Sequence, residues 1–560
     1  MLTALLLALP LAPAPAPPVQ QPSEKDLFDA ALARLKPTQA EDGRYGPDLA
    51  TTVDAVLGFE LSPRSYRVDD GPFLERALTW LRAHRDEAVG EVVEARLALA
   101  FAFAHPFRFH PEASAILSRH GWTLGTALGL AVGGVPPELT PSAVLTAPEP
   151  SPEEALQRYS AAHPGLRLED APVVALAASV ARAGLLRLQR DGLGLAPVDA
   201  PSRAEVEAAY GRGVAFLLAA RSPEGWWEAF GQPEPGISAI AALALLRSGA
   251  PESRAAAHAT LDWLVSLQKD DGSIHAGRVQ VYTTSVAIGA LVAADDPKYA
   301  DAIARARAFL EGVQVDEGEG YDPDHKFYGG IGYGGDLRPD LSNLQYAMEA
   351  LHQAGAGPDD PAFRRAMRFL QRVQNRSESN PETYYDQGDP RPVRAGNDGG
   401  AAYYPGNSPA GYDLLPDGTR VARSYGSMTY ALVKCYVFAG LPLDDPRLAA
   451  AVGWIQSHWT LEVNPGFDLV RDPKSGAQGL FYYYETVAEA LDAAGLLWVT
   501  DTAGVRHDWR AELTAELLRR QREDGSWVNE DAPRWWEGNP VLCTGYALSA
   551  LHAAAGTGGR

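Results

Sequence analysis

The stretch Leu513–Leu551, LTAELLRRQREDGSWVNEDAPRWWEGNPVLCTGYALSAL, predicts two helices joined by a tight turn. Its first half has apolar residues at the spacing of an amphipathic helix that ends near Gln521: Leu513, Leu517 and Leu518. Gly525 lets the backbone reverse without a Cβ clash. An aromatic-rich loop then leads to a second helix from about Val541, whose alanines keep it thin enough for close packing. The stretch is therefore one helical hairpin.

The same hairpin is repeated upstream. The frame Gln521-x-x-x-Gly525-x-Trp527 has counterparts that begin at Gln39, Arg221 and Gln268, and Gln314-x-x-x-Gly318 keeps its first part. The second helices also recur, and they end at Leu245, Leu291, Leu351, Cys435, Leu491 and Leu551. These six copies lie between Gly213 and Leu551. A helix–turn–helix unit does not bury its apolar face alone, so the copies must stack.

The Gln-x-x-x-Gly-x-Trp frame at the end of a first helix resembles the repeat of squalene and oxidosqualene cyclases and of protein prenyltransferase β-subunits. The resemblance covers roughly residues 205–555. It implies an all-α fold, an (α/α)6 toroid of six helical hairpins whose second helices form an inner ring around an apolar cavity. We expect a helical N-terminal region built from degenerate repeats to precede this toroid.

Composition and charge limit the function classes. The 560 residues are 46% hydrophobic, which allows a large core. The net charge is −22, from 49 basic and 71 acidic residues, and no long basic cluster occurs, so nucleic acid and anionic membrane surfaces are poor partners. After the N-terminus no segment reaches the roughly 18–20 uninterrupted apolar residues of a transmembrane helix.

The expected domain organisation has three parts. Residues 1–22 predict a secretory signal peptide and linker, hence a secreted or periplasmic protein, because MLTALLLALPLAPAPA combines an apolar core with small residues near a cleavage site. The alternative is a disordered Ala/Pro leader. Residues 23–195 form the N-terminal helical region, and residues 205–560 form the toroid, with the boundary near the Pro- and Gly-rich residues 191–202.

Metal, cofactor and hydrolase signals are weak. The Asp-x-Asp-Asp acid of class II terpene cyclases does not occur, and Asp322-Pro-Asp324 does not match it. Cys543 falls where the resemblance to prenyltransferases implies a zinc-binding His, but the preceding second helix has no Asp-x-Cys, and one ligand is not a site. Cys435 and Cys543 are about 12 Å apart along parallel helices, too far for a disulfide. We expect no cofactor, no metal and no Gly-x-Ser-x-Gly hydrolase site.

Two long loops between first and second helices, residues 318–340 and 377–423, are rich in Gly, Tyr and Asp. All such loops gather at one end of a toroid, so we place the site there. Aromatic faces suit a cation, an isoprenoid chain or a sugar ring. The predicted substrate-binding residues are Tyr328, Tyr333, Arg338, Asn343, Arg423, Tyr425, Tyr482, Tyr483, Tyr484, Trp535, Trp536 and Glu537.

Two carboxyl groups are candidate catalytic acids. Glu485 follows three tyrosines on a helix that should line the lumen, where burial raises the pKa of a carboxyl into the range of a general acid. A salt bridge to Arg423 or to another arginine explains Glu485 almost as well. Asp340 precedes Leu341-Ser-Asn343 at a helix start, so its alternative role is an N-cap.

The leading hypothesis is an exported squalene cyclase-like or prenyltransferase-like protein that acts on or binds an isoprenoid or another apolar ligand. If it is an enzyme, the resemblance favours a terpene cyclase-like isomerase or lyase. One alternative is a polysaccharide lyase or glycosidase with a carbohydrate ligand, which an open groove with two facing carboxylates would favour. A second is a non-catalytic binding or scaffold module. Nucleic acid is not expected as a partner, and contact with a membrane surface stays open.

Overall fold

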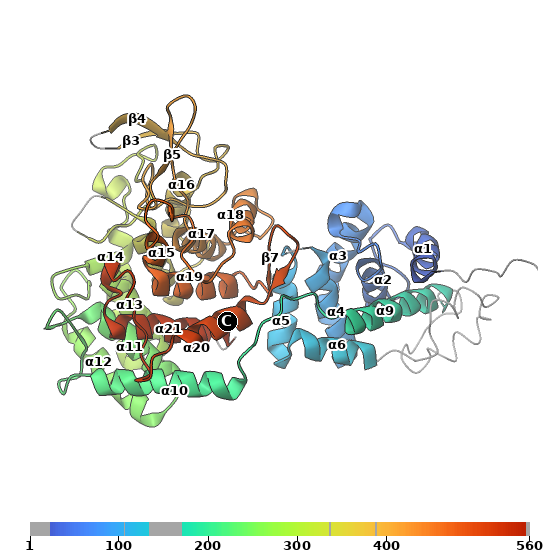
Figure 1. The fold of residues 1–560 in the computed structure, drawn as a ribbon, viewed down its shortest axis with the longest axis horizontal. Coiled ribbons are helices and arrows are strands. Elements are labelled where there is room, and N and C mark those ends of the chain that lie inside the picture. Colours follow the sequence, from blue (N-terminus) through green and yellow to red (C-terminus); the bar gives the residue numbers. More distant parts are fainter. Residues whose placement is uncertain (1–22, 106, 134–170, 335–337, 387–388, 556–560) are drawn as a thin grey trace, which may run out of the picture. The chain divides into compact units, whose positions relative to one another are not determined.

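The computed structural model describes residues 23–105, 107–133, 171–334, 338–386 and 389–555 (Figure 1). The chain divides into two compact units. The first contains the chain up to Ala104 together with Trp122–Asp191, and the second contains His105–Gly121 and Gly192–Arg560. Cys435 and Cys543 are both free and buried.

Six parallel helices form the centre of the second unit. They are α11 (Pro235–Arg247), α13 (Gln280–Ala293), α15 (Leu341–Gln353), α17 (Gly426–Phe438), α19 (Leu480–Ala493) and α21 (Pro540–Ala554). Each contacts the next in this order, and α11 contacts α21, so the ring is closed. Nearly every residue of these helices is buried, because packing surrounds them on all sides. The predicted toroid and its inner ring are confirmed.

Six outer helices surround the ring. They are α10 (Arg203–Ala220), α12 (Pro251–Ser266), α14 (Ala300–Gly312), α16 (Pro361–Val373), α18 (Pro446–Ser457) and α20 (Trp509–Arg520). Each buries one apolar stripe against the ring and leaves its polar face in solvent, which is the pattern of an amphipathic helix. On α16, for example, Phe363, Ala366, Phe369 and Leu370 are buried while the arginine-rich face is turned outward.

The glutamine and glycine of the repeat frame join neighbouring hairpins. Gln268 Nε2 donates to the carbonyl oxygens of Gly272 and of Ala302 on the next outer helix, both at 2.9 Å. Gly272 has φ +91°, and a Cβ there would overlap the Arg305 backbone. Equivalent glutamines make the same pair of bonds at Gln39, Gln314, Gln374 and Gln521. The frame is thus the connection between repeats.

The structure corrects one predicted frame and adds another. Gln314 pairs with Gly329, not with Gly318, because residues 318–328 are inserted before the turn, and only Gly329 has a positive φ and lies against the Arg365 carbonyl. Gln374 pairs in the same way with Gly399, 25 residues away in sequence. Neither pair can be recognised in the sequence, because the glutamine and the glycine are too far apart in it.

The second residue after the glycine anchors the turn to the inner helix. The backbone N–H of Trp527 donates to Thr544 Oγ1 at 3.1 Å, and its indole Nε1 donates to the Leu517 carbonyl at 2.8 Å. Trp227 makes the matching bonds to Ser238 and Leu217. Both rings are completely buried.

The second long loop contains a small sheet that the sequence did not predict. Its strands are β3 (Thr383–Asp386), β4 (Asp389–Arg394), β5 (Tyr412–Leu414) and β6 (Arg420–Ala422), in the order β3-β4-β6-β5. The pairs are antiparallel except β4 with β6. The sheet lies at the top of Figure 1, beyond α16. Two-stranded ribbons also occur at β1 (Glu228–Ala229) with β2 (Gln232–Pro233) and at β7 (Val499–Thr500) with β8 (Arg506–His507).

The first unit is a smaller helical array. Its helices are α1 (Glu24–Leu35), α2 (Leu49–Glu60), α3 (Pro72–His84), α4 (Glu91–Ala104), α6 (Leu124–Gly133) and α9 (Ala171–Asp191). Among them α2, α4, α6 and α9 contact one another in a closed cycle. The predicted Gln39–Gly43 frame is present, which identifies this array as a degenerate form of the same repeat.

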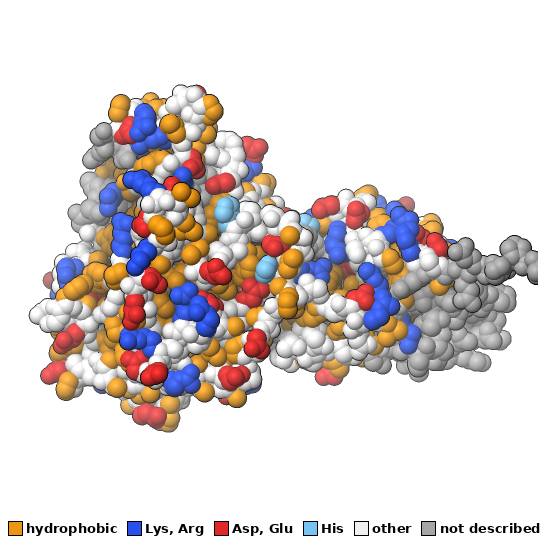
Figure 2. All heavy atoms as spheres, viewed as in Figure 1, with side chains coloured by type: hydrophobic (Ala, Val, Ile, Leu, Met, Phe, Trp, Pro, Cys, Tyr) orange, Lys and Arg blue, Asp and Glu red, His pale blue; other side chains and the backbone are white. Residues whose placement is uncertain are grey.

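Two further expectations concern export and membranes. The predicted signal peptide at residues 1–22 lies outside the described residues. In the described part of the chain, no helix has the length and apolarity needed to cross a bilayer. On the toroid face visible in Figure 2, basic and acidic side chains are interspersed.

Candidate functional site

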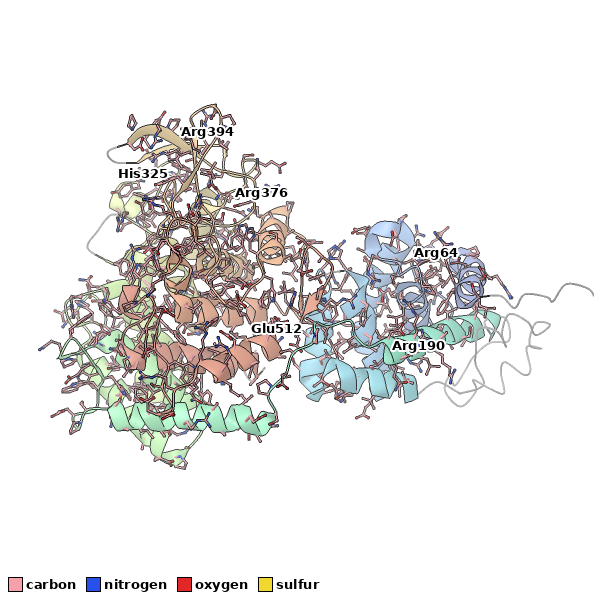
Figure 3. The ribbon with its side chains drawn as sticks, viewed as in Figure 1. Arg64, Arg190, His325, Arg376, Arg394 and Glu512 are labelled. Carbon is pink, nitrogen blue, oxygen red and sulfur yellow. The ribbon has the colours of Figure 1, made fainter. Side chains whose placement is uncertain are left out.

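A cavity of about 620 Å³ lies where the loops meet the beginnings of the inner helices. The two long loops supply Tyr333, Arg338, Tyr403, Tyr404, Asn407 and Pro409 to its wall. The inner helices α13, α15, α17, α19 and α21 supply most of the rest. Arg372 on α16 contacts both loops, because its Nη1 donates to the His325 carbonyl at 2.6 Å and its Nε donates to Glu382 at 2.8 Å. His325 of the first loop and Arg376 and Arg394 near and within the second are labelled in Figure 3. The volume is that of a small-molecule site.

Eight of the predicted binding residues line this cavity: Tyr333, Arg338, Asn343, Tyr425, Tyr482, Trp535, Trp536 and Glu537. Arg338 is exposed at the mouth, with its guanidinium 5.4 Å from the Tyr404 ring centroid. Tyr425 is buried and packs edge-on against Phe467. Whether these residues bind a ligand stays a prediction.

Four other predicted binding residues have structural partners elsewhere. Tyr328 donates to the Glu317 carboxylate at 3.1 Å. Tyr483 and Tyr484 donate to the carbonyls of Thr460 and Leu461, each at 2.7 Å. Arg423 is paired with Asp413 at 2.7 Å and Asp468 at 3.4 Å, so it braces the loops and does not pair with Glu485.

Asp340 lies behind the cavity wall as the N-cap of α15. Its carboxylate accepts from the Asn343 backbone N–H at 2.9 Å, from Ser342 Oγ at 2.6 Å and from Asn343 Nδ2 at 2.9 Å. Burial raises the pKa of Asp340, and these donors oppose the rise. The carboxylate orients Ser342 and Asn343, which line the cavity in its place.

Four tyrosines from four inner helices surround the lumen, and we call them the tyrosine ring: Tyr282, Tyr346, Tyr482 and Tyr546. The Tyr282 and Tyr346 ring centroids are 5.1 Å apart, with the rings nearly perpendicular. The ring centroids of Tyr346 and Tyr482 are 6.0 Å apart, and those of Tyr482 and Tyr546 are 6.1 Å apart. The hydroxyls of Tyr282 and Tyr546 close the ring at 3.1 Å.

Next to the tyrosine ring, further along the lumen, lie four charged side chains, the carboxyl–lysine cluster: Glu349, Lys434, Glu485 and Glu489. Tyr346 donates its hydroxyl to Glu485 Oε2 at 2.8 Å. Lys434 Nζ donates to Glu349 and Glu489, both at 2.7 Å. Burial, and then the negative charge of Glu489, raise the pKa of Glu485 well above its ordinary value. Burial lowers the pKa of Lys434, but its two carboxylate partners outweigh it and the net pKa is raised.

Glu537 is the only carboxylate among the described residues that line the cavity. Its Oε1 accepts from the Tyr482 backbone N–H at 2.8 Å and its Oε2 from Asn529 Nδ2 at 2.6 Å. Helix α19 has Gly479 at its N-cap, which offers no side chain, so Glu537 caps this helix from another repeat. Burial raises the pKa of Glu537 to about 7, against the effect of these donors.

The cavity mouth has bulky residues in the left-handed backbone region. Phe230, Val279, Trp535 and Trp536 have φ of 54°, 44°, 57° and 69°. Phe230 packs edge-on against Trp536 at 5.6 Å, and Trp535 lies over Gly479. Such conformations cost about 1–3 kcal/mol each, persist only where the surroundings hold them, and cluster at binding sites.

Sequence reasoning named Tyr482 but missed the other three members of the tyrosine ring, Tyr282, Tyr346 and Tyr546. Tyr282 and Tyr482 lie nine residues before the leucines that end their helices, Leu291 and Leu491. Tyr346 and Tyr546 lie five residues before Leu351 and Leu551. These positions are one helical turn apart and share a face. Alignment of the second helices on their last leucine would therefore have found them.

The described residues contain no group of three or more His, Cys, Asp or Glu that could hold a metal ion. Cys543 is buried, and its Sγ lies 3.1 Å from the Glu537 carbonyl oxygen. Burial raises the pKa of this thiol well above its ordinary value. It is therefore an inert core residue.

The comparisons with known proteins agree with the repeat. Residues 232–405, which run from α11 through α16 to Tyr404 in the cavity wall, match the squalene-hopene cyclase C-terminal domain family. Over these residues the toroid is similar to the squalene-hopene cyclase C-terminal domain.

Several solved structures are similar to this chain. A type II terpene cyclase from Scytonema, MstE, in complex with geranylgeranyl dihydroxybenzoate, is 16% identical with a TM-score of 0.39 and covers 63% of this chain and 98% of that one. A protein from Actinoplanes is 18% identical with a TM-score of 0.33, over 62% and 99% of the two chains. No curated protein matches the sequence.

Proposed function

We propose that the squalene cyclase-like toroid binds an isoprenoid or a similar apolar chain in the cavity. The observation that carries this proposal is the wall itself. Eight tyrosines and two tryptophans line it, with Met428, Leu542 and Val279 among the other residues. Aromatic and aliphatic walls of this kind bury an apolar chain at about 25 cal/mol per Å².

The carbohydrate alternative has less support. Hydrolysis by a glycosidase needs two carboxyl groups that flank the bond. Among the described lining residues only Glu537 has a carboxylate, and both its oxygens already accept hydrogen bonds. The cavity therefore supports an apolar ligand better than sugar cleavage.

A binding measurement tests the proposal. Titration calorimetry with farnesol as the probe should show saturable binding to the wild-type protein. Met428→Trp fills the cavity and should abolish binding, whereas Met367→Trp, on outer helix α16, should leave it unchanged. Absence of binding, or equal binding by Met428→Trp, would overturn the proposal.

A second candidate function is acid-catalysed conversion of the bound chain. The observation that favours it is the hydrogen bond from Tyr346, which lines the cavity, to the buried Glu485. A carboxyl kept neutral by burial can supply a proton through the tyrosine hydroxyl. Incubation with squalene and geranylgeraniol, followed by mass spectrometry, should show a product that Glu485→Gln fails to form although it still binds the substrate. If the wild-type protein forms no product, the toroid only binds.

Export is a separate proposal. It rests on the apolar leader of residues 1–22 alone. N-terminal sequencing of protein from the culture medium or periplasm should find a mature N-terminus near Ala14–Gln21. An intact Met1 in the mature protein would contradict it.

A further inference from the structure

Beyond the tyrosine ring the lumen continues to the C-terminal ends of the inner helices, and we call this part the far lumen. Glu349 and Ser549 lie three residues after Tyr346 and Tyr546, one helical turn further along the same helix faces. Glu489 lies two turns after Tyr482 on α19. The faces that present the tyrosine ring to the cavity therefore present polar and charged side chains to the far lumen.

A chain of polar contacts enters the far lumen from the cavity wall. Tyr346, which lines the cavity, donates its hydroxyl to Glu485 Oε2 at 2.8 Å. Glu485 and Glu489 are one turn apart on α19, so their side chains are neighbours. Lys434 Nζ donates to Glu489 and to Glu349, both at 2.7 Å. Each carboxyl group and the tyrosine hydroxyl can both accept and donate a proton.

Exposure increases along this chain with distance from the cavity. Glu485 is 4% exposed, whereas the side chains of Glu489 and Glu349 are 16% and 18% exposed. One further turn on, Gln353 is half-buried and Ala293 is exposed. Water therefore reaches the far lumen from the C-terminal ends of the inner helices, at the end of the toroid opposite to the cavity mouth.

The tyrosine ring separates Glu485 from the cavity. Glu485 is not among the described residues that line the cavity, and the Tyr346 hydroxyl connects it to that space. An apolar chain that fills the cavity excludes water from it. A proton that Glu485 gives to the ligand through Tyr346 must therefore be replaced from the other end of the lumen.

We propose that the far lumen is a proton path, along which Glu489 returns a proton from water to Glu485 after Tyr346 has passed one to the ligand. The inference rests on acid-catalysed conversion, the second candidate function above, and names the residues that would sustain it. Lys434 is a positioning residue, because it holds Glu489 and Glu349 in place and stays charged throughout.

The protons balance over one turnover. The Tyr346 O–H bond breaks as a C–H bond forms at a double bond of the ligand, and the Glu485 proton restores the tyrosine hydroxyl. Glu489 then gives its proton to Glu485 and takes another from water. The cation left on the ligand loses a proton from a neighbouring carbon to water. One proton thus enters and one leaves, and no electron is transferred.

Hydrogen–deuterium exchange at the Glu485 carboxyl tests the path in the full chain without a ligand. A protonated carboxyl has its own infrared band, which shifts when deuterium replaces the proton. The band that Glu485→Gln removes from the spectrum belongs to Glu485, and its shift after transfer to D₂O gives the exchange rate. If Glu485→Gln removes no band, Glu485 carries no proton and the proposal fails.

A variant of the relay and a surface control assign the rate to the path. Glu489→Gln keeps the size and the hydrogen bonding of the side chain but does not pass a proton on, so it should slow exchange at least about tenfold. Glu530→Gln makes the same change at an exposed position and should exchange as fast as the wild-type protein. Exchange at the wild-type rate in Glu489→Gln would overturn the proposal.

A second variant blocks the path without a change in its carboxyl groups, which covers the case in which Glu489→Gln does not fold. A Cβ at Gly289 on α13 would meet only the amide end of Gln353, a flexible group, within 4 Å. Gly289→Leu should therefore fill the far lumen and slow exchange at least about tenfold, whereas Gly289→Ala should exchange at nearly the wild-type rate. Met428→Trp, which fills the cavity, should not slow exchange. Slow exchange in Met428→Trp and fast exchange in Gly289→Leu would mean that protons enter through the cavity, which contradicts the path.

Turnover separates this proposal from the acid function on which it rests. If the wild-type protein converts squalene or geranylgeraniol, Glu489→Gln should complete a first turnover at the wild-type rate and slow the later ones at least about tenfold, because Glu485 starts with its proton. Product formation with unchanged later turnovers would leave the acid function standing and overturn the path. If no product forms while exchange still depends on Glu489, the far lumen conducts protons and acid-catalysed conversion is the claim that fails.

Discussion

The repeat glycines are positions where a side chain has no room. At Gly272 the backbone has φ +91°, and a Cβ would overlap the carbonyl oxygen of Arg305 on the next outer helix. Gly272→Ala should lower the free energy of unfolding by about 3 kcal/mol, because it adds both backbone strain and a clash with backbone. Denaturant unfolding of the purified protein measures this loss.

Gly312, at the end of α14, is the matched control. It has no positive φ and no neighbour within 4 Å of a Cβ. Gly312→Ala should therefore change stability by less than about 1 kcal/mol and in the stabilising direction. Equal losses for the two variants would mean that the repeat turn does not need its glycine.

Trp527 is a packing residue and not part of the site. Its ring is completely buried, and its indole N–H donates to Leu517 at 2.8 Å. Trp527→Ala should cost on the order of 3 kcal/mol. Trp527→Phe keeps most of the ring and should cost less. Farnesol affinity should stay the same in the folded variants, and an unchanged unfolding midpoint for Trp527→Ala would refute the packing role.

At the residue scale the sequence predicts the repeat well. The contacts of Gln521, Gly525 and Trp527 are made within a short, fixed spacing. Their counterparts at Gln39 and Gln268 can therefore be recognised in the sequence. The pairs Gln314–Gly329 and Gln374–Gly399 are not visible, because inserted loops separate the partners while the contacts remain the same.

Three inner helices are joined by one buried lysine. Lys434 on α17 is paired with Glu349 on α15 and Glu489 on α19, each at 2.7 Å. Lys434→Met leaves two carboxylates without their cation and should destabilise the protein by about 3–5 kcal/mol. The triple variant with Glu349→Gln and Glu489→Gln should recover most of this loss. A triple variant as unstable as Lys434→Met would show that the lysine acts through packing alone.

The cap that Glu537 provides to α19 should depend on pH. Burial raises the pKa of Glu537 to about 7 in the folded protein, from its ordinary value of 4.5. The stability that this group contributes is present below pH 4.5 and is lost as the pH rises through about 7. Between pH 5 and pH 8 the wild-type protein should thus lose about 3 kcal/mol more than Glu537→Gln. Parallel pH profiles for the two proteins would contradict this.

At the element scale the sequence predicts where the site is but only half of what forms it. The loop residues Tyr333, Trp535 and Trp536 stand out because glycine-rich and aromatic loops are unusual in a core. Of the tyrosine ring only Tyr482 stands out, and Tyr282, Tyr346 and Tyr546 do not, because single tyrosines within Ala- and Leu-rich helices look like ordinary core residues. Which helix face turns into a closed ring depends on all six repeats at once.

At the scale of the whole chain, helix α5 (His110–His120) belongs with the toroid although residues 122–191 of the first unit separate the two in sequence. The His110 ring packs edge-on against Trp498 at 4.5 Å, and its Nδ1 accepts from the Leu497 N–H at 3.3 Å. Arg108 is paired with Asp444 at 3.0 Å. Sequence order alone assigns this segment to the N-terminal region, because only the tertiary contacts place it.

This packing predicts how a truncated toroid behaves. A chain that begins at residue 192 lacks α5 and exposes the surface around Trp498, so its unfolding midpoint should fall by about 5 °C relative to the full chain. A synthetic peptide of residues 107–121 should restore part of the loss and change the fluorescence of Trp498 on titration. The same peptide with His110→Ala loses the ring contact and the hydrogen bond to Leu497, so it should bind at least tenfold more weakly. If neither peptide changes the midpoint, α5 does not stabilise the toroid, and the unit would then consist of residues after 191 alone.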